Sequence, residues 1–400
     1  MKERSIKDPV HGSIGVPEAM QQLLDLPAVQ RLRHIRQLGF SYLVYPGANH
    51  TRFEHSLGTM HLASKTASHL SLTEEESTLV IASALLHDIG HGPYSHAIEL
   101  LIEEELGTSH TYIEPLLNES LLNDSLCALD LDSTEVSAMI AGTHRLSEII
   151  HGDLDVDRMD YLLRDAHYTG VPYGTVDCER LIHSMRLSDN GLLLEESGIH
   201  AAESLLIART LMRPSVYFHH VSRIAEKMFQ HAVWCAMQTG IQPATLFARQ
   251  DDAACMQTLL SSSNQSIASL CHRIYSRNLY KRAIYVSRDD LYHQEWGTCR
   301  SLTERKYANI IADIAHILPE QVLVDIPPFP GNMQINVLVQ QRSSMIPLEE
   351  VSPLITTLNE ARRRQWRLGV YCPPEVSEKV TAAATEIFHC KQPTTQERLL

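Results

Sequence analysis

Long apolar runs, paired cysteines and an excess of positive charge are all missing from this sequence. No run of 18 or more apolar residues occurs, so no membrane-spanning helix is predicted. The opening stretch Met1–Gly12 carries five charged residues and lacks the apolar segment of a signal peptide. No two of the eight cysteines have C-x-x-C spacing, which disfavours a zinc knuckle or a redox pair. We therefore expect a cytoplasmic protein with reduced thiols.

Positive charge is scarce, with 34 Lys and Arg against 48 Asp and Glu and a formal net charge of −14. This balance argues against a broad nucleic-acid interface, which needs a basic surface. It leaves room for an acidic substrate in a local basic pocket. The 400 residues, 44% of them hydrophobic, suffice for one large or two ordinary domains with a buried core.

Helical periodicity dominates residues 17–250. Apolar residues recur at three- and four-residue spacing in the stretches Met20–Leu38, Glu54–Leu70, Glu74–Leu86 and Ala201–Thr239. Thr73 and Glu76 form a capping-box pattern at the start of the third stretch. The run Leu79–Leu86 that follows is apolar almost all round, which predicts a central, buried helix.

The C-terminal part has a different pattern, beyond a polar and weakly periodic stretch at 245–266. Short β-like runs alternate there with helical ones, at Ala283–Ser287, Gln321–Asp325, Ile335–Gln340 and Leu368–Cys372. We therefore predict a mainly α fold, with a helical core over residues 1–250. A smaller α+β module over residues 251–400 would serve oligomerisation or regulation. The polar end, 391–400, is expected to fray.

The residues that carry chemistry gather where the buried helix ends. His87 and Asp88 follow that helix directly, and His91 and His96 lie within the next eight residues. A single histidine at a helix end has many structural uses, but this cluster indicates a site. Imidazole nitrogens and carboxylate oxygens together suit Mn, Fe, Zn or Ni.

Two other segments can complete a metal site. His55 lies at the start of a predicted helix. Asp157, Tyr161 and Asp165 fall on one face of another, at i, i+4 and i+8. A face with two carboxylates and a phenol is costly to bury unless it serves a ligand or pairs with cations. A solvated helix face is the alternative interpretation.

The order His55, His87-Asp88, Asp157 resembles the HD-domain metal-dependent phosphohydrolases, in which these four positions hold the metal. Three longer segments resemble the deoxynucleoside triphosphate (dNTP) triphosphohydrolases of the SAM-and-HD-domain type and their prokaryotic homologues: Asp8–Gly12, Gln30–Gly39 and Tyr45–Gly58. The resemblance covers residues 5–225 closely and the remainder loosely. It implies one divalent metal ion per active site (Mn, Fe, Ni, Zn or Mg) and a homo-oligomer, dimeric or tetrameric.

The resemblance also implies a reaction, in which water attacks the α-phosphorus of a dNTP and releases deoxynucleoside and intact triphosphate. His96 matches the acid that protonates the leaving 5′-oxygen, with Glu99 one helical turn on, and His91 and His110 match contacts to the α-phosphate. The residues matched to phosphate binding are Arg52, Arg158 and Arg209, the second of which replaces a Lys of the family. Those matched to the deoxyribose are Gln37, Leu38, Tyr161, Asp165 and Tyr217.

The sequence departs from the resemblance at two places. Thr111 follows His110 where the most similar relatives have a Glu of a His/carboxylate relay. Some relatives need a guanine nucleotide at an allosteric site, and Asp25, Gln30 and Arg33 match part of that site. Lys7 replaces an Asn of the same site, so activation by GTP or a dNTP is left open.

Two other functions stay open at this point. One is a different HD-type phosphoester hydrolase, a nucleotidase or phosphodiesterase; the other is a nucleotide-binding regulator that has lost catalysis, which only Thr111 favours.

The run Arg362–Arg367 is the one strongly basic patch. A solvated helix face is its favoured interpretation, and a phosphate-binding or regulatory contact is the alternative.

Overall fold

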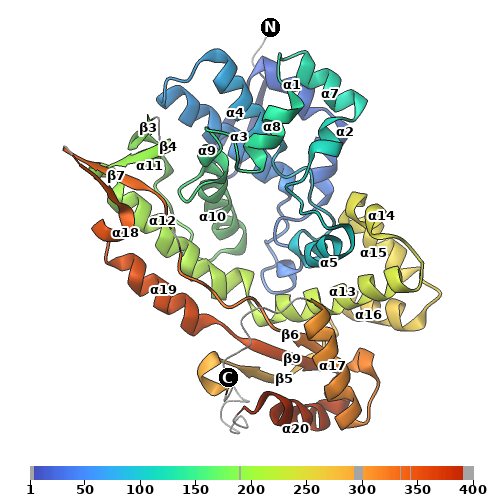
Figure 1. The fold of residues 1–400 in the computed structure, drawn as a ribbon. Helices are drawn as coiled ribbons and strands as arrows, with labels where there is room; N and C mark the ends of the chain where they lie inside the picture. Colours follow the sequence, from blue (N-terminus) through green and yellow to red (C-terminus); the bar gives the residue numbers. More distant parts are fainter. Residues whose placement is uncertain (1–3, 189–190, 292–300, 334, 343, 391–400) are drawn as a thin grey trace.

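The structure is a computed structural model that describes residues 4–188, 191–291, 301–333, 335–342 and 344–390. It is mainly helical with small sheets, as the sequence predicts (Figure 1). Within these ranges, none of the helices combines the length and the apolar character needed to cross a membrane. The predicted fraying of 391–400 lies outside the described residues.

The first eleven helices, α1 to α11, precede residue 184 and form most of the upper part of Figure 1. They are α1 (Glu18–Leu24), α2 (Pro27–Arg31), α3 (Arg52–His69), α4 (Glu74–Leu86), α5 (His96–Leu106), α6 (Glu114–Leu117), α7 (Ser120–Cys127), α8 (Ser133–Ile140), α9 (Glu148–His151), α10 (Val156–Thr169) and α11 (Cys178–His183). The later helices are α12 (Ile199–Met212), α13 (His220–Gln238), α14 (Ala244–Arg249), α15 (Asp252–Leu260), α16 (Gln265–Tyr275), α17 (Ser301–Ala315), α18 (Leu348–Val351), α19 (Leu354–Gln365) and α20 (Ser377–Phe388).

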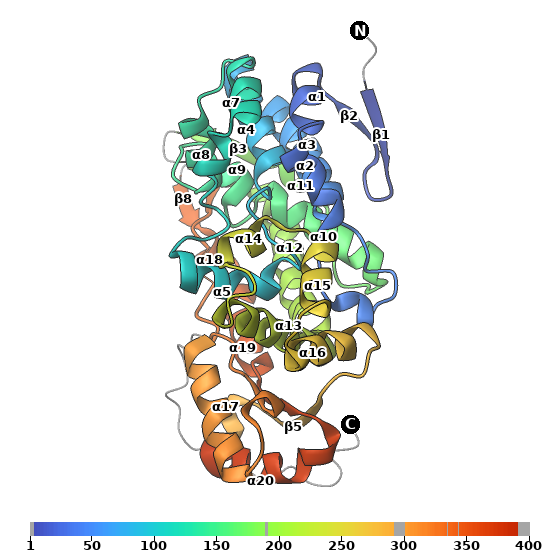
Figure 2. The same cartoon turned by 90° about the vertical axis from the view of Figure 1, so that its right-hand side faces the viewer.

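The described residues form three small sheets. An N-terminal antiparallel hairpin joins β1 (Arg4–Asp8) to β2 (Gly12–Val16) and lies beside α1 (Figure 2). A second sheet has the order β3 (Met185–Ser188), β4 (Gly191–Glu195), β7 (Leu338–Gln341), β8 (Ser344–Pro347). The third has the order β5 (Lys281–Val286), β9 (Leu368–Cys372), β6 (Leu323–Asp325), and α17 and α20 pack against it. All four predicted β-like runs thus contain strand residues.

Two of the predicted helical stretches are interrupted. The stretch Met20–Leu38 breaks because Pro27 begins α2 and the residue before a proline disfavours helical backbone. The chain then leaves α2 through a 3₁₀ turn, so residues 37 and 38 lie in a loop. The stretch Ala201–Thr239 is divided by a π-helical turn, η4 (Arg213–Tyr217), between α12 and α13. Both interruptions bring residues of the candidate site to loop or turn positions.

Helices α3 and α4 form the centre of the larger apolar cluster. The predicted capping box is present, since Thr73 N donates to Glu76 Oε2 at 3.0 Å and Glu76 N donates to Thr73 Oγ1 at 3.2 Å. Leu79–Leu86 is buried throughout, which confirms the central helix. Helix α3 meets α10 at Gly58, where an added Cβ would lie 1.8 Å from Asp160 Oδ1. Only glycine allows this close approach.

A buried ion network joins the hairpin to these helices. Arg164 of α10 is fully buried; its Nη1 donates to Asp8 Oδ2 at 2.7 Å, and its Nε and Nη2 donate to Asp160 at 2.9 Å each. The Asp160 carboxylate also contacts His11 Nε2 at 2.6 Å and His55 Nδ1 at 2.7 Å. Burial opposes ionisation of Asp160, but the Arg164 charge holds the pKa of this carboxyl well below its usual range.

We expect Arg164→Met to lower the free energy of unfolding by about 3–5 kcal/mol, because it leaves buried carboxylates without their cation. Lys65→Met is the matched control, since Lys65 pairs with Glu179 at 3.1 Å but both side chains are largely exposed. It should cost less than about 1 kcal/mol. Urea unfolding followed by circular dichroism measures both changes. Equal losses in the two variants would contradict the role of the network.

Candidate active site

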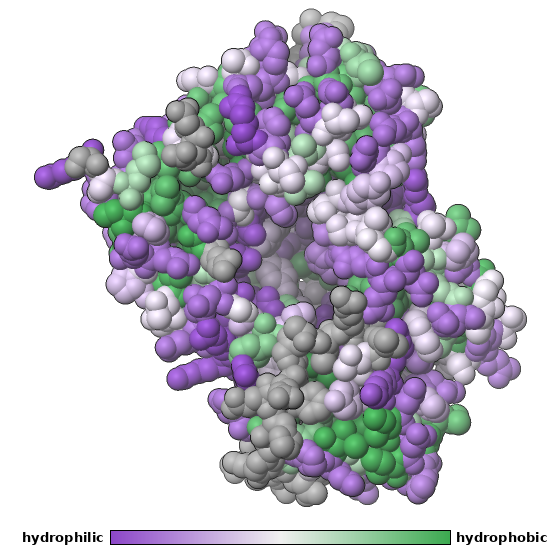
Figure 3. Space-filling view, viewed as in Figure 1, coloured by the Kyte–Doolittle hydropathy of each residue, from purple (hydrophilic) through white to green (hydrophobic). Residues whose placement is uncertain are grey.

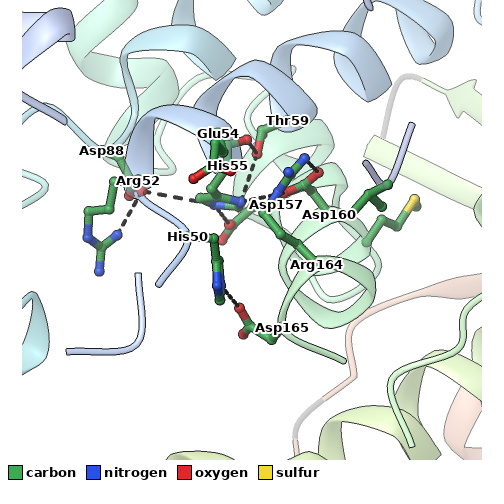
Figure 4. A network of polar contacts seen from close by, with 12 residues as sticks. His50, Arg52, Glu54, His55, Thr59, Asp88, Asp157, Asp160, Arg164 and Asp165 are labelled. Atoms are coloured by element: carbon green, nitrogen blue, oxygen red, sulfur yellow. Dashed lines mark hydrogen bonds and ion pairs between the residues drawn. The ribbon is translucent and has the colours of Figure 1, made fainter. Parts of the chain in front are cut away.

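The four predicted metal ligands come from three helices and meet at one point. His55 is in the first turn of α3, His87 and Asp88 follow α4, and Asp157 is in the first turn of α10. His55 Nε2 lies 2.9 Å from Asp157 Oδ1 and 3.9 Å from Asp88 Oδ2. His87 Nε2 lies 3.3 Å from Asp88 Oδ1 and 3.7 Å from Asp157 Oδ1. Figure 4 shows His55, Asp88 and Asp157 of this cluster turned toward one another.

Second contacts orient the two imidazole rings. His55 Nδ1 lies 2.7 Å from Asp160 Oδ2, and His87 Nδ1 lies 2.8 Å from the Ala84 carbonyl oxygen. In the neutral imidazoles these acceptors would hold the proton on Nδ1 and leave the Nε2 lone pair to a metal, an arrangement common in metal sites. His87 Nε2 is buried and has no hydrogen-bond partner among the described residues. The His/Asp cluster therefore fits a divalent metal ion.

The electrostatics of the cluster favour positive charge. Burial alone would lower the pKa of His55, but Asp157 and Asp160 raise it to about 10. The pKa of Asp157 is lowered, because its hydrogen bonds to His55 and His87 outweigh the effect of burial. A cation in this position is stabilised by the carboxylate of Asp157 on α10 and by that of Asp88, which follows α4.

Arg52 connects the cluster to the loop after it. Its guanidinium is buried and donates from Nη1 to Asp88 Oδ2 and from Nε to Ser95 Oγ, each at 2.7 Å. Its Nη2 is buried and lacks a hydrogen-bond partner within the described part of the chain. Arg52 thus fixes Asp88 and keeps donor capacity for an anion.

The turn before α5 is held in an uncommon conformation. Tyr94 and Ser95 both have φ of 55°, a backbone conformation that residues other than glycine rarely adopt. Asp252 accepts from the Tyr94 backbone N–H at 2.6 Å, and the Tyr94 ring stacks on Phe40 with centroids 4.3 Å apart. These contacts stabilise the strained turn that presents His96 as the first residue of α5.

A second group of histidines shares one carboxylate. Glu99 Oε2 lies 2.6 Å from His96 Nδ1, and Glu99 Oε1 contacts His110 Nδ1. The His91 and His110 rings stack with centroids 4.0 Å apart, and His91 Nε2 lies 3.3 Å from Asp88 Oδ1. Burial and the charge of Arg52 lower the pKa of His91 to about 3, so this imidazole is neutral.

Thr111 stands apart from this contact. Its hydroxyl bonds Ser109 Oγ at 2.7 Å. The carboxylate that contacts His110 here is Glu99, which comes from α5 rather than from the residue after the histidine. A His/carboxylate pair is therefore present although Thr111 replaces the acid of the relatives.

One cavity of about 150 Å³ connects both groups. It is lined by all four candidate ligands and by Gln37, Arg52, His91, His96, His110 and Tyr161. The Gln37 Oε1 atom is buried there, with no hydrogen-bond partner among the described residues. Figure 3, which is viewed as in Figure 1, shows a hollow near the centre of the molecular surface.

Three of the predicted sugar contacts form a row beside the cluster. Tyr161 lies with its ring centroid 6.4 Å from that of His55 and 6.1 Å from that of Tyr217. Asp165 accepts from the Tyr217 hydroxyl at 2.9 Å and contacts His50 Nε2 at 2.8 Å (Figure 4). Leu38 packs against the larger apolar cluster.

The other two candidate phosphate ligands do not line the cavity. Arg158 donates to the Gly152 carbonyl and to the Asp155 carboxylate. Arg209, on α12, lies near Tyr161: burial raises the pKa of that phenol to about 12, and the charge of Arg209 opposes the increase.

The candidate allosteric residues lie together, away from the cavity lining. Gln30 accepts from Arg33 Nε at 2.8 Å, and Asp25 pairs with Arg4 of β1 at 2.9 Å. The charges of Asp25 and Arg4 both act on Arg33.

Sequence reasoning missed several residues that position the site. Asp160 and His50 contact candidate residues more than 100 positions away, so no local pattern indicates them. Ser95 is a short, common residue whose role depends on the strained turn. His11 lies in the segment Asp8–Gly12, so its place in a matched motif was the available signal.

Comparison with known proteins agrees with this geometry. Residues 52–165 match the model of the HD domain, and residues 176–399 match that of the HD associated region. An uncharacterized protein of Methanocaldococcus jannaschii is 38% identical over 92% of this chain and 79% of its own length. The deoxynucleoside triphosphate triphosphohydrolase SAMHD1 homolog of Dictyostelium discoideum is 31% identical over 72% of this chain and 61% of its own length.

Solved structures extend the similarity to the whole fold. A hypothetical protein from Aquifex aeolicus has a TM-score of 0.76 at 29% identity and covers 96% of this chain and 100% of its own. A phosphohydrolase from Bacteroides thetaiotaomicron has a TM-score of 0.73 at 25% identity, over 93% of this chain and 100% of its own. With both family models matched and the His/Asp cluster assembled, the chain belongs to the HD-domain phosphohydrolases.

Proposed function

We propose that this protein hydrolyses dNTPs to deoxynucleoside and inorganic triphosphate. The observation that carries the proposal is the single cavity that joins the His/Asp cluster to the His96–Glu99 pair. A metal site alone would suit any phosphoester, whereas a histidine–carboxylate pair beside it can also protonate a poor leaving group. The similarity to the SAMHD1 homologues supports the choice of a dNTP.

The metal ion would be held by His55, His87, Asp88 and Asp157. When bound, a divalent ion supplies a Lewis acid at a phosphoryl oxygen. The mixed nitrogen and oxygen ligands suit Mn, Fe, Ni, Zn or Mg. We propose one ion per site, at the group of His55, His87 and Asp88, with Asp157 in contact with both histidines. The homo-oligomer, the activating nucleotide and the division into residues 1–250 and 251–400 stay predictions.

The chain's own residues would bind the substrate and move the proton. Arg52 Nη2 has donor capacity for a phosphate oxygen, and neutral His91 lies beside Asp88. As a water oxygen bonds to the α-phosphorus and the bond to the 5′-oxygen breaks, His96 gives its proton to the departing oxygen. Burial and the charge of Arg52 lower the pKa of His96 to about 4. The Glu99 carboxylate, 2.6 Å from His96 Nδ1, would favour the imidazolium form that an acid requires.

The sugar would lie along the row of Tyr161, Asp165 and Tyr217. The unpartnered Gln37 Oε1 and the Asp165 carboxylate are acceptors suited to a 3′-hydroxyl. Burial and Asp165 raise the pKa of Tyr217 well above its usual value, so its phenol stays a neutral donor. Leu38 and Tyr217 would leave no space for a 2′-hydroxyl.

Product analysis tests the proposed reaction. Each dNTP is incubated with the protein and Mn²⁺, Mg²⁺, Fe²⁺ or Ni²⁺, with and without GTP, and the products are separated by anion-exchange chromatography. We expect deoxynucleoside and intact triphosphate. Orthophosphate with a nucleoside mono- or diphosphate would replace the proposal with a different phosphohydrolase. Unchanged dNTPs on a metal-loaded protein would favour the regulator.

We expect His87→Ala and Asp88→Ala to lose both bound metal and turnover, because each removes a ligand from the cluster. Metal per chain is measured by mass spectrometry of the digested protein, and turnover by chromatography. His200→Ala is the control, since that side chain is 93% exposed on α12. A His87→Ala variant with full metal content would show that the metal lies elsewhere.

We expect His96→Ala to keep the metal but to lower kcat about 10²–10⁴-fold, the range for removal of a general acid. Glu99→Gln should lower kcat by a smaller factor, because the imidazole remains and loses only its carboxylate partner. Steady-state kinetics with the metal content measured in parallel separates the two roles. Full activity in His96→Ala would rule out this residue as the acid.

A further inference from the structure

The basic run Arg362–Arg367 does not form one solvated face. Arg363 and Arg364 are exposed, but Arg362 and Arg367 line a cavity of about 240 Å³. The cavity lies where η4 and the start of α13 meet the ends of β6 and α19. We call it the arginine pocket, after the four arginines that line it: Arg213, Arg223, Arg362 and Arg367. Figure 1 shows α19 running alongside α12 toward β9.

The charges of the arginine pocket are not balanced by acids. Among the residues that the structure describes, Asp325 is the only carboxylate that lines it, and Arg223 already binds both of its oxygens, at 2.6 and 3.1 Å. Arg362 reaches Asn359 Oδ1 at 3.4 Å, and Arg367 donates to main-chain carbonyls. Arg213 stacks on the Phe218 ring at 4.1 Å. None of these three has an ion-pair partner in the described ranges.

This concentration of positive charge is costly without a ligand. Burial, together with the charges of Arg362, Arg209 and Arg223, lowers the pKa of Arg213 to about 10. Burial and Arg209 also lower the pKa of Arg362. In a chain with a net charge of −14, three half-buried arginines without acids are an exception. An anion between them would relieve the repulsion.

The walls of the pocket are rigid and suit a phosphate. Trp366 is buried and donates from Nε1 to the Pro327 carbonyl at 2.6 Å, which fixes that side. Gln365 also lines the pocket; its Oε1 is buried with no partner in the described part, and a flipped amide would present its NH₂ donors instead. Guanidinium forks bind phosphate oxygens in pairs. The cavity volume of about 240 Å³ leaves room for a short phosphate chain.

We infer that the arginine pocket binds the phosphate chain of a nucleotide or free polyphosphate at a site separate from the metal centre. The two cavities share no lining residue. The inference does not rest on which phosphoester the metal centre cleaves. Helix α12 carries Arg209, whose charge acts on Tyr161 of the metal-centre cavity, and is followed by Arg213 of the arginine pocket.

Calorimetric titration of the metal-loaded protein with inorganic tripolyphosphate tests the inference. Arg213→Gln and Arg362→Gln should each weaken one binding event at least tenfold, or abolish it. Neither substitution touches the metal centre, so the difference from the wild type isolates the pocket. Arg364→Gln is the control, because it removes an equal charge from the exposed face of the same helix. It should change the affinity less than twofold.

Thermal unfolding checks that the variants are folded, so that a loss of binding can be assigned to the arginine pocket. Arg213→Gln and Arg362→Gln should melt no lower than the wild type without ligand, since they remove like charges, and should lose the stabilisation that tripolyphosphate gives. Unchanged binding in both folded variants would overturn the inference. An equal loss in Arg364→Gln would also overturn it, because the effect would then be general charge.

Two further ligands, GTP and a non-hydrolysable dATP analogue, distinguish a nucleotide from free polyphosphate as the source of the bound phosphate. Tighter binding of either nucleotide than of tripolyphosphate, weakened by Phe218→Leu, assigns the pocket to a nucleotide whose base contacts the aromatic wall. Equal affinities that Phe218→Leu does not change assign it to polyphosphate. Turnover of dNTPs is not part of these measurements, so they are independent of the proposed reaction.

Discussion

The carboxylate of Asp160 is the contact on which both the fold and the candidate site depend. It is fully buried and joins three parts of the chain: Arg164 of its own helix, His11 in the turn of the N-terminal hairpin, and His55 of α3. A buried charge of this kind is tolerated only when its partners are all present. The same carboxylate contacts Nδ1 of His55, a candidate metal ligand, so the packing of α10 on α3 and the orientation of His55 depend on each other. Gly58 makes that packing sterically feasible.

The parts that the sequence predicts well depend on neighbours along the chain. The buried helix α4, its capping box and the grouping of His87 with Asp88 follow from spacing over fewer than 20 residues. The parts that it predicts poorly depend on distant contacts. The parallel pairing of β4 with β7, about 145 residues apart, and the contact of His50 with Asp165 have no local signal. The helix break at Pro27 has a local cause, but the helical spacing of apolar residues continues across it and hides the break.

Glu99 shows how one role can move between positions. The residue after His110 is a threonine here, and sequence comparison alone would count this as the loss of a relay. In the structure, the Glu99 carboxylate lies between His96 and His110 and contacts both. A carboxylate in that place orients an imidazole whichever element supplies it, because the electrostatic attraction between the two groups depends on where the carboxylate oxygens lie. The substitution of Thr111 therefore does not by itself favour a protein without catalysis.

The net charge of the whole molecule does not predict the charged groups that line its individual cavities. A total of −14 disfavours contact with a long polyanion, and that argument concerns the field of the whole surface. A short phosphate chain experiences a few neighbouring groups instead. Around Arg52 and around Arg213, burial removes water and leaves guanidinium donors with fewer acids than they can bind. Such donors suit a compact anion even in a chain of negative net charge. The acidic composition is thus compatible with the proposed binding of small phosphorylated ligands at these two cavities.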